Sequence, residues 1–144
     1  MQNIKSNIKF LEEKEVRLII DGIGTRKHWR NFRDRAILET LFSTGLRVKE
    51  LVSLPDAPFT DCKEQTLELS IVGKGGWQRT IYFSPRALKS IKDYLAVRVD
   101  VDMRLFPVTT RAVEYIVKKR ATKVGLSWVH PHTLRHSLAT DLLD

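Results

Sequence analysis

The chain has 144 residues and a formal net charge of +8, from 25 Lys and Arg against 17 Asp and Glu. Its 42% hydrophobic and 29% charged content is typical of one soluble globular domain, and no apolar run approaches the roughly 20 residues that a membrane span needs. The single cysteine, Cys62, excludes an internal disulfide framework and favours the cytoplasm. The excess of basic residues indicates a nucleic-acid partner, and no membrane partner is expected.

Three helices are predicted in the first third of the chain. Apolar residues recur at helical spacing in 10–24, a stretch with acidic residues near its start and glycines at its end. The same spacing recurs in 32–45, where Gly45 marks the end. A shorter helix is expected in 46–55, because Pro55 cannot continue one.

The pattern then changes to a period of two residues. Residues 66–73 and 78–83 each alternate apolar and polar side chains, which predicts two half-buried strands. The glycines of 74–77 predict a turn between them, and therefore an antiparallel hairpin. A third short strand near 57–61 is an additional hypothesis.

Helices are predicted again after the hairpin. Ser84, followed by a proline, provides the N-cap of a helix over 84–99. A threonine cap precedes the next helix, over 109–125, and a last helix is expected from about Pro131 to the end. The predicted fold class is therefore mainly α with one small antiparallel β-hairpin.

Two arginines fall in the apolar stripes of predicted helices. On a helical wheel Arg47 lies between Leu51 and Leu54, and Arg135 lies between two leucines of the last helix. Both guanidinium groups are therefore expected to face inward, where an arginine needs an anion because it cannot lose its proton. For Arg47 that anion could be Glu50, in an internal salt bridge. Because both arginines begin helices, whose N-termini attract anions, they could instead hold a phosphodiester between them.

Other polar side chains accompany the arginines. His132 shares a helical turn with Arg135, and it could donate to a phosphate oxygen or transfer a proton. His136 is expected to pack and to support its neighbours. Lys74 occupies the glycine-flanked hairpin tip, where neighbouring positive charge would lower its pKa and make it a plausible general acid.

Four further residues are candidates for contacts with a nucleic-acid backbone. Trp77 and Arg79 follow the hairpin tip and combine an aromatic side chain with a cation. Lys118 and Lys119 belong, together with Arg120, to a basic run on a later helix that could touch the backbone, although such a run is often only a solvated face.

A metal site is the weaker alternative for the histidines. His132 and His136 have the i, i+4 spacing of a zinc-binding helix. However, Thr133 stands where that chemistry needs a glutamate, and the charge of Arg135 would oppose a metal ion. No metal is therefore expected.

Three stretches together resemble the tyrosine recombinases of the phage-integrase type: STGLRVKELVSL, IVGKGGWQRTIYF and PHTLRHSLATDLL. The resemblance runs from about Phe10 to Asp144, with the motifs in the family's order. It implies the family's catalytic-core fold, and strand cleavage through a 3′-phosphotyrosine followed by rejoining. It also implies that no cofactor is needed, because the covalent intermediate keeps the bond energy.

The resemblance implies a role for each candidate residue. Arg47 and Arg135 look like the two arginines that hold the scissile phosphate. Lys74 looks like the hairpin lysine that protonates the leaving 5′ oxygen, and His132 like the histidine that assists proton transfer. Glu50 resembles the acidic residue that orients the first arginine.

No residue of the chain fits the family's nucleophile. Tyr82 belongs to a predicted strand, and Tyr94 and Tyr115 to helices before the last motif. Residues 1–144 are therefore expected to form a single integrase-type catalytic domain that is incomplete at its C-terminus and lacks the family's amino-terminal domain. We expect no covalent DNA adduct from this chain alone. A truncated protein, a natural remnant and a tyrosine supplied in trans are the open explanations, of which truncation is favoured.

The expected partner is double-stranded DNA, in the cytoplasm. The resemblance implies a homo-oligomer as well, because the family acts as a tetramer on two duplexes. The alternative function is a non-catalytic DNA-binding regulator on the same scaffold, in which the arginines hold a phosphate without turnover. A type IB topoisomerase shares the chemistry, but the first and last motifs are closer to the integrase pattern.

Overall fold

The structure, a computed structural model, describes residues 11–129 apart from the side chain of Lys74. In chain order the elements are α1 (Glu13–Asp21), α2 (Trp29–Thr44), α3 (Val48–Leu51), α4 (Ala57–Thr60), β1 (Leu67–Val72), the 3₁₀ turn η2 (Lys74–Gly76), β2 (Gln78–Phe83), α5 (Pro85–Val97) and α6 (Thr110–Lys123). The predicted fold class, mainly α with one antiparallel hairpin, is confirmed. The helix predicted from Pro131 lies outside the described residues.

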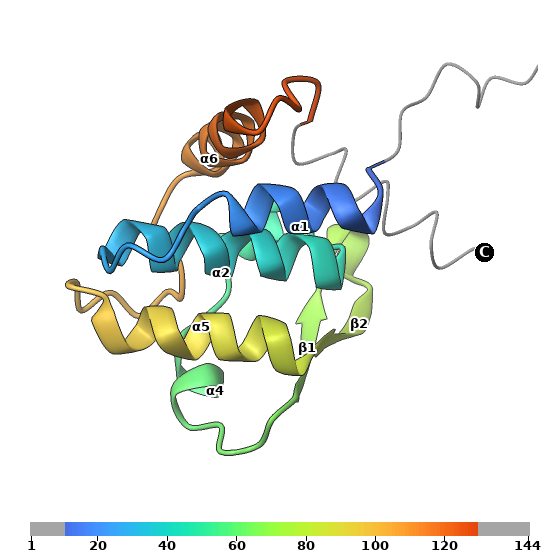
Figure 1. Ribbon diagram of the computed structural model, residues 1–144. Helices are drawn as coiled ribbons and strands as arrows, with labels where there is room; N and C mark the ends of the chain where they lie inside the picture. Colours follow the sequence, from blue (N-terminus) through green and yellow to red (C-terminus); the bar gives the residue numbers. More distant parts are fainter. Residues whose placement is uncertain (1–10, 130–144) are drawn as a thin grey trace, which may run out of the picture.

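Helix α2 is the centre of the fold. Helix α5 packs along it, α1 lies beside it, and α6 contacts both α1 and α2 (Figure 1). Ala36, Ile37 and Leu38 of α2 are each no more than 2% exposed, so its middle is enclosed by the other helices. Within 11–129, no helix has the length and apolar content needed to cross a bilayer.

The predicted helix boundaries after the hairpin follow from local hydrogen bonds. The Ser84 hydroxyl accepts from the backbone N–H of Ala87 at 3.3 Å, and the Thr109 hydroxyl accepts from that of Ala112 at 3.0 Å. Both are N-cap bonds that satisfy donors left free at a helix start. Gly45 ends α2 at a φ of 72°, a conformation that favours glycine.

Helix α2 begins at Trp29, three residues before the predicted start. Its N-cap is His28, whose Nδ1 accepts from the backbone N–H of Arg30 at 3.1 Å. Histidine is not among the residues usually preferred at an N-cap, so no capping signal predicts this earlier start.

The two strands pair as predicted, but the hypothesis of a third strand near 57–61 is wrong. Leu67 faces Phe83 and Leu69 faces Ile81 in the antiparallel ladder. The stretch 57–61 instead contains the short helix α4, in which two backbone N–H groups donate to the carbonyl oxygen of Asp56.

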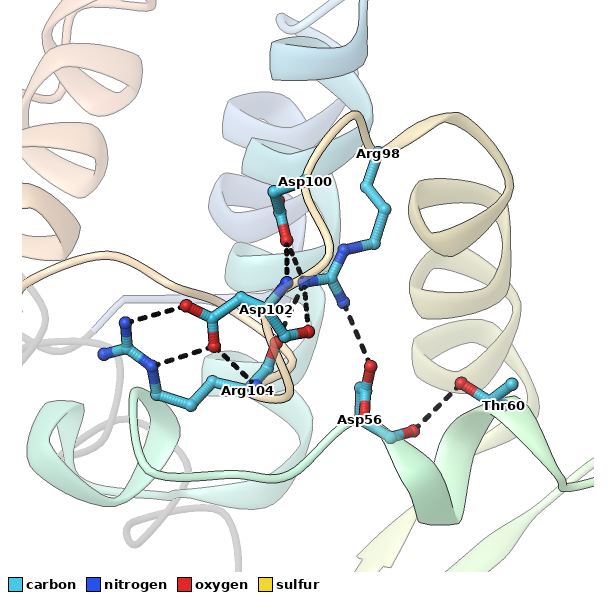
Figure 2. Close-up of polar contacts among 6 residues, drawn as sticks. All are labelled: Asp56, Thr60, Arg98, Asp100, Asp102 and Arg104. Carbon is cyan, nitrogen blue, oxygen red and sulfur yellow. Dashed lines mark hydrogen bonds and ion pairs between the residues drawn. The ribbon is translucent and has the colours of Figure 1, made fainter.

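The connection from α5 to α6 folds around one arginine (Figure 2). The Arg98 guanidinium donates to the carbonyl oxygens of Asp102 and Arg104, each at 3.1 Å, and pairs with the Asp100 carboxylate. Its Nη1 also lies 3.6 Å from the Asp56 carboxylate, which precedes α4. Because the Arg98 side chain is only 8% exposed, this connection is a packed part of the fold.

Candidate functional site

Arg47 lies at the surface, and the prediction that it faces the core is wrong. It is the N-cap of α3, with φ −73° and ψ 151°, and its side chain is exposed. The helical wheel does not apply to it because the first helical residue is Val48. The leucines on either side of it in the wheel, Leu51 and Leu54, are buried as expected. The exposed guanidinium is therefore accessible to a ligand from solvent.

Glu50 pairs with Arg79 and not with the side chain of Arg47. Its two carboxylate oxygens accept from Arg79 Nη1 at 2.8 Å and Nη2 at 2.9 Å. Glu50 Oε1 also accepts from the backbone N–H of Arg47 at 2.9 Å. The hypothesis of an internal Arg47–Glu50 salt bridge is therefore wrong. Within 11–129, no carboxylate forms a salt bridge with the Arg47 guanidinium.

The surroundings of Glu50 keep its carboxylate ionised. Partial burial alone would raise the pKa of Glu50, but the hydrogen bonds from Arg79 and from the Arg47 backbone lower the pKa below its ordinary value. The hydrogen bond to Glu50 correspondingly raises the pKa of Arg79. Both groups are therefore charged near neutral pH, as a bidentate ion pair requires.

The tip of the hairpin lies against this ion pair. A Cβ at Gly73 would stand 3.0 Å from Arg79 Nη1 and 3.1 Å from Glu50 Oε2. The Gly73 N–H donates to the Trp77 carbonyl oxygen at 2.8 Å, which closes the tip. The backbone of Lys74, the next residue, is consequently held beside the turn that carries Arg47.

An open pocket of about 560 Å³ lies between α3 and β1. Its lining combines charged groups from the Arg47 turn with apolar groups from the strand: Arg47, Lys49, Glu50, Ser53, Leu54, Pro55, Ile71, Val72 and Gly73. An anion entering this pocket would meet the guanidinium of Arg47 and the ammonium of Lys49, while the negative charge of Glu50 is offset by Arg79. The arrangement therefore suits a singly charged phosphodiester.

Three of the predicted site residues belong to the C-terminal segment of the chain. His132, Arg135 and His136 lie outside the described residues, so their approach to Arg47 stays a prediction. The metal alternative rests on two of those histidines and is likewise outside the described part. Within 11–129, no group of three or more His, Cys, Asp or Glu side chains is arranged to hold a metal ion.

The candidates for backbone contacts differ in exposure. Trp77 is 80% exposed, so its ring is free to contact a ligand. Lys118 and Lys119 are exposed on α6; the first donates to the Ser127 carbonyl oxygen, and the second lies 5.9 Å from the Tyr115 ring centre. Arg79 is different, because its guanidinium is already occupied by Glu50.

Sequence reasoning missed that Arg79 is the partner of Glu50. A signal for it exists in the strand QRTIYF, where Arg79 shares the face of Ile81 and Phe83. Those two apolar residues are buried, so the arginine on their face needs a carboxylate nearby. The alternation that predicts the strand therefore also places the Arg79 side chain beside the core.

None of the three tyrosines, all in the described part of the chain, lines the pocket. Tyr94 is 1% exposed and stacks on Phe106 with ring centres 5.5 Å apart. Tyr82 and Tyr115 are exposed on β2 and α6. Core packing explains Tyr94, and the positions of the other two give no support to a nucleophilic role.

Comparison with known proteins identifies relatives over nearly the whole chain. The model of the phage integrase family matches residues 9–144. The tyrosine recombinase XerC of Leptospira interrogans is 39% identical over 124 residues, which cover 78% of this chain and 38% of that protein. XerC of Staphylococcus saprophyticus is 33% identical over 151 residues, covering 94% of this chain and 48% of the relative. The chain thus spans half the length, or less, of these relatives.

Solved structures share the fold. The crystal structure of XerA recombinase has a TM-score of 0.75 and 26% identity, covering 94% of this chain and 49% of that one. XerH site-specific recombinase bound to its difH substrate also has a TM-score of 0.75, at 21% identity, and the match covers 94% of this chain and 42% of that one. These superpositions confirm the fold that the three sequence motifs implied.

Proposed function

The chain belongs to the phage integrase family, and from that membership we propose that it forms the phosphate-binding part of the catalytic domain of a site-specific tyrosine recombinase. The observation that supports this most directly is the exposed Arg47. Its guanidinium lines an open pocket, while Glu50, the carboxylate among the described residues of the pocket lining, is already paired with Arg79. A surface arginine held beside a pocket without a carboxylate salt bridge of its own suits an anionic ligand.

The proposed reaction exchanges one phosphodiester for another. A tyrosine oxygen attacks the scissile phosphorus, the bond to the 5′ oxygen breaks, and a 3′-phosphotyrosine and a free 5′ hydroxyl result. Lys74 supplies the proton that the 5′ oxygen gains, and His132 assists the proton transfers. The 5′ hydroxyl of another strand then attacks the phosphotyrosine and releases the tyrosine, so DNA is rejoined without an external energy source.

The arginines carry the electrostatic part of this reaction. Phosphoryl transfer builds negative charge on the equatorial oxygens, and fixed cations stabilise that charge without rearranging. Arg47 would contact one such oxygen from its turn before α3, and Arg135 another. Glu50 holds the Arg47 backbone through the 2.9 Å hydrogen bond to its N–H, which limits the movement of that turn.

We propose double-stranded DNA as the partner and the cytoplasm as the place of action. The net charge of +8 supports a polyanionic partner, and the fold is that of recombinases, one of which, XerH, was solved bound to its difH substrate. A homo-oligomer assembled on DNA is part of the same proposal. Trp77, Lys118 and Lys119 are proposed to contact the DNA backbone.

The test is strand cleavage by the complete gene product that includes residues 1–144. A nicked duplex carrying its recombination site traps the covalent intermediate, which appears as a slow band on a denaturing gel. We expect Arg47→Gln to lower the cleavage rate by at least about 100-fold, the usual effect of removing a group that stabilises the transition state. Because the Arg47 side chain is exposed, the thermal stability of the Arg47→Gln protein should differ little from that of the wild type.

The matched control is Arg86→Gln, which removes an exposed arginine at the start of α5 that does not line the pocket. It should cleave at the wild-type rate. Equal cleavage by Arg47→Gln and wild type would contradict the proposal. Specific DNA binding with no covalent product from the wild-type protein would instead favour the non-catalytic regulator.

A further inference from the structure

We propose that Arg79 is a positioning residue, which fixes the hairpin tip that carries Lys74 relative to the turn that carries Arg47. The inference rests on the proposed function and assigns Arg79 a task other than contact with DNA. Arg79 comes from β2, Glu50 from α3, and the two are 29 positions apart in the chain. Their ion pair is therefore a tertiary link between two segments that each bring one cation to the site.

The geometry of the link is rigid. Two parallel N–H···O bonds of 2.8 and 2.9 Å fix both the distance and the relative orientation of the two planar groups. The Glu50 side chain is 12% exposed and that of Arg79 is 36% exposed, so the carboxylate is the better shielded of the two groups. The third hydrogen bond of the carboxylate reaches the Arg47 backbone, which places the Arg47 turn in the same unit.

The hairpin tip completes the unit. Gly73 packs directly on both charged groups, closely enough that a side chain there would displace one of them. Its N–H bonds to the Trp77 carbonyl oxygen, and its own carbonyl oxygen accepts from the Gly76 N–H at 3.2 Å. Movement of the Arg79–Glu50 pair would therefore be passed to the backbone on both sides of Lys74.

This link matters for the reaction because positioning governs phosphoryl transfer. A misplacement of about 1 Å at a catalytic group can slow a reaction by about 100-fold. A lysine on a glycine-rich tip has many conformations open to it, and glycines add to that freedom. An anchor at the base of the tip reduces the freedom before DNA binds.

The competing explanation is that Arg79 contacts a DNA phosphate directly. The two explanations differ in three measurable quantities: amide exchange at the hairpin tip, salt dependence of DNA binding, and cleavage rate. The test compares wild type with Arg79→Met, which keeps the aliphatic stem and removes the guanidinium. Arg79→Lys is the conservative variant, since its ammonium restores the charge but cannot form both bonds at once.

The control is Arg17→Met. Arg17 and Glu39 form a second bidentate pair, at 3.1 and 2.6 Å, that links α1 to α2. Removing it breaks the same kind of interaction outside the pocket lining. Arg17→Met should lower the stability of the protein. Amide exchange at the hairpin tip, the salt dependence of DNA binding and the cleavage rate at saturating DNA should all stay at their wild-type values.

The positioning role predicts a specific combination of results. In Arg79→Met, the Gly73 and Gly76 amides should exchange about tenfold faster or more, the factor expected when charge-assisted hydrogen bonds are lost. Cleavage at saturating DNA should fall by about 10- to 100-fold, while the dependence of log affinity on log salt keeps its wild-type slope. Arg79→Lys should recover part of the rate.

A modified substrate connects the defect to Lys74. When sulfur replaces the bridging 5′ oxygen, the leaving group no longer needs a proton from an acid. The deficit of Arg79→Met should therefore shrink on this substrate, whereas a purely structural loss would persist unchanged.

Three outcomes would overturn the inference: unchanged exchange at Gly73 and Gly76, cleavage at the wild-type rate, or loss of about one unit of salt slope, the mark of a direct phosphate contact. Absence of cleavage by the wild-type protein would refute the proposed function instead. In that event the exchange measurement still decides whether Arg79 holds the tip.

Discussion

At the scale of single residues, Gly73 is the position where the site leaves least room. Its φ of −92° is open to any residue, so the backbone conformation does not demand glycine. Space does, because a methyl group would stand 3.0 Å from Arg79 and 3.1 Å from Glu50. Both neighbours are fixed by their mutual hydrogen bonds, and neither can retreat without weakening the pair.

We therefore expect Gly73→Ala to destabilise the protein by about 1–2 kcal/mol, the range for forcing an extra carbon into a packed site. Urea unfolding followed by circular dichroism measures the effect. The same substitution made in the Arg79→Met background should cost clearly less, because one of the two crowding groups has gone. Equal costs in the two backgrounds would show that the methyl group meets no obstruction from the ion pair.

Glu50 gives the site a dependence on acid. Its pKa is lowered in the folded protein, so the unfolded chain binds more protons as pH falls toward and below the ordinary value of 4.5. The stabilisation from Glu50 is therefore complete above that value and is lost as pH decreases through the lower, folded pKa. Wild type should exceed Glu50→Gln in unfolding free energy near pH 7, and the difference should narrow progressively below about pH 4.5. Urea unfolding at a series of pH values measures this difference in unfolding free energy. A difference that stayed constant from pH 7 to below pH 4.5 would contradict the prediction.

The exposure of Arg47 and the partner of Glu50 are two features of the site that the sequence pattern does not predict. Identifying Arg47 as a site residue needed only its motif, but its exposure depends on whether α3 begins before or after it. Periodicity cannot decide that, because a helical wheel assumes the residue is already helical. The choice of Arg79 rather than Arg47 as the salt-bridge partner of Glu50 depends on how the hairpin packs against α3, which is tertiary information.

At the scale of elements, the connection between α5 and α6 depends on Arg98 (Figure 2). Its guanidinium bonds to two backbone carbonyls and to Asp100 while remaining 8% exposed. Val99, Val101 and Met103 point outward from the same connection and are 73%, 99% and 82% exposed. The first part of the connection, residues 98–104, therefore takes its shape from its polar side chains, whereas Leu105 and Phe106, further along, are buried in the core.

Arg98→Met should destabilise the protein by about 2–3 kcal/mol, because it removes a buried guanidinium that donates to two backbone carbonyl oxygens and to the Asp100 carboxylate. Arg104→Met is the matched control in the same connection: its side chain is 52% exposed, and its solvent-screened pair with Asp102 should contribute little to stability. Thermal unfolding compares the two. A cost for Arg98→Met no larger than that of Arg104→Met would show that the connection is held in some other way.

Elements with strong local signals were the most predictable. The hairpin has alternating apolar and polar residues on both sides of a glycine turn, which predicts its two strands. The helices of 84–99 and 109–125 have side-chain caps, which predict where each helix starts. The hypothetical strand near 57–61 had no such signal. There a single helical turn forms because two N–H groups bond to Asp56, and the nearby pairing of Pro55 with Arg104 is only an isolated bridge.

At the scale of the whole molecule, buried charges on α2 tie the helices together. Asp34 is 2% exposed and accepts from Arg120 Nε and Nη2 at 3.0 and 2.9 Å, which joins α2 to α6. Arg33 pairs with the other oxygen of the same carboxylate at 3.0 Å. The sequence placed Arg120 in a basic run beside Lys119, and only the packing of α6 on α2 separates the buried cation from the exposed one.

Removing Arg120 should consequently affect the whole fold. Arg120→Met leaves the buried Asp34 carboxylate with a single partner, and we expect the unfolding free energy to fall by about 3 kcal/mol or more. Lys119→Met, one position earlier and exposed, should change it by less than about 0.5 kcal/mol. The double variant Asp34→Leu with Arg120→Met should recover much of the loss, because two apolar side chains then replace the broken pair in the same space. Equilibrium unfolding in urea measures all four proteins. If the double variant were less stable than Arg120→Met alone, apolar side chains could not replace the ion pair. The packing of α6 would then depend on the two charges themselves.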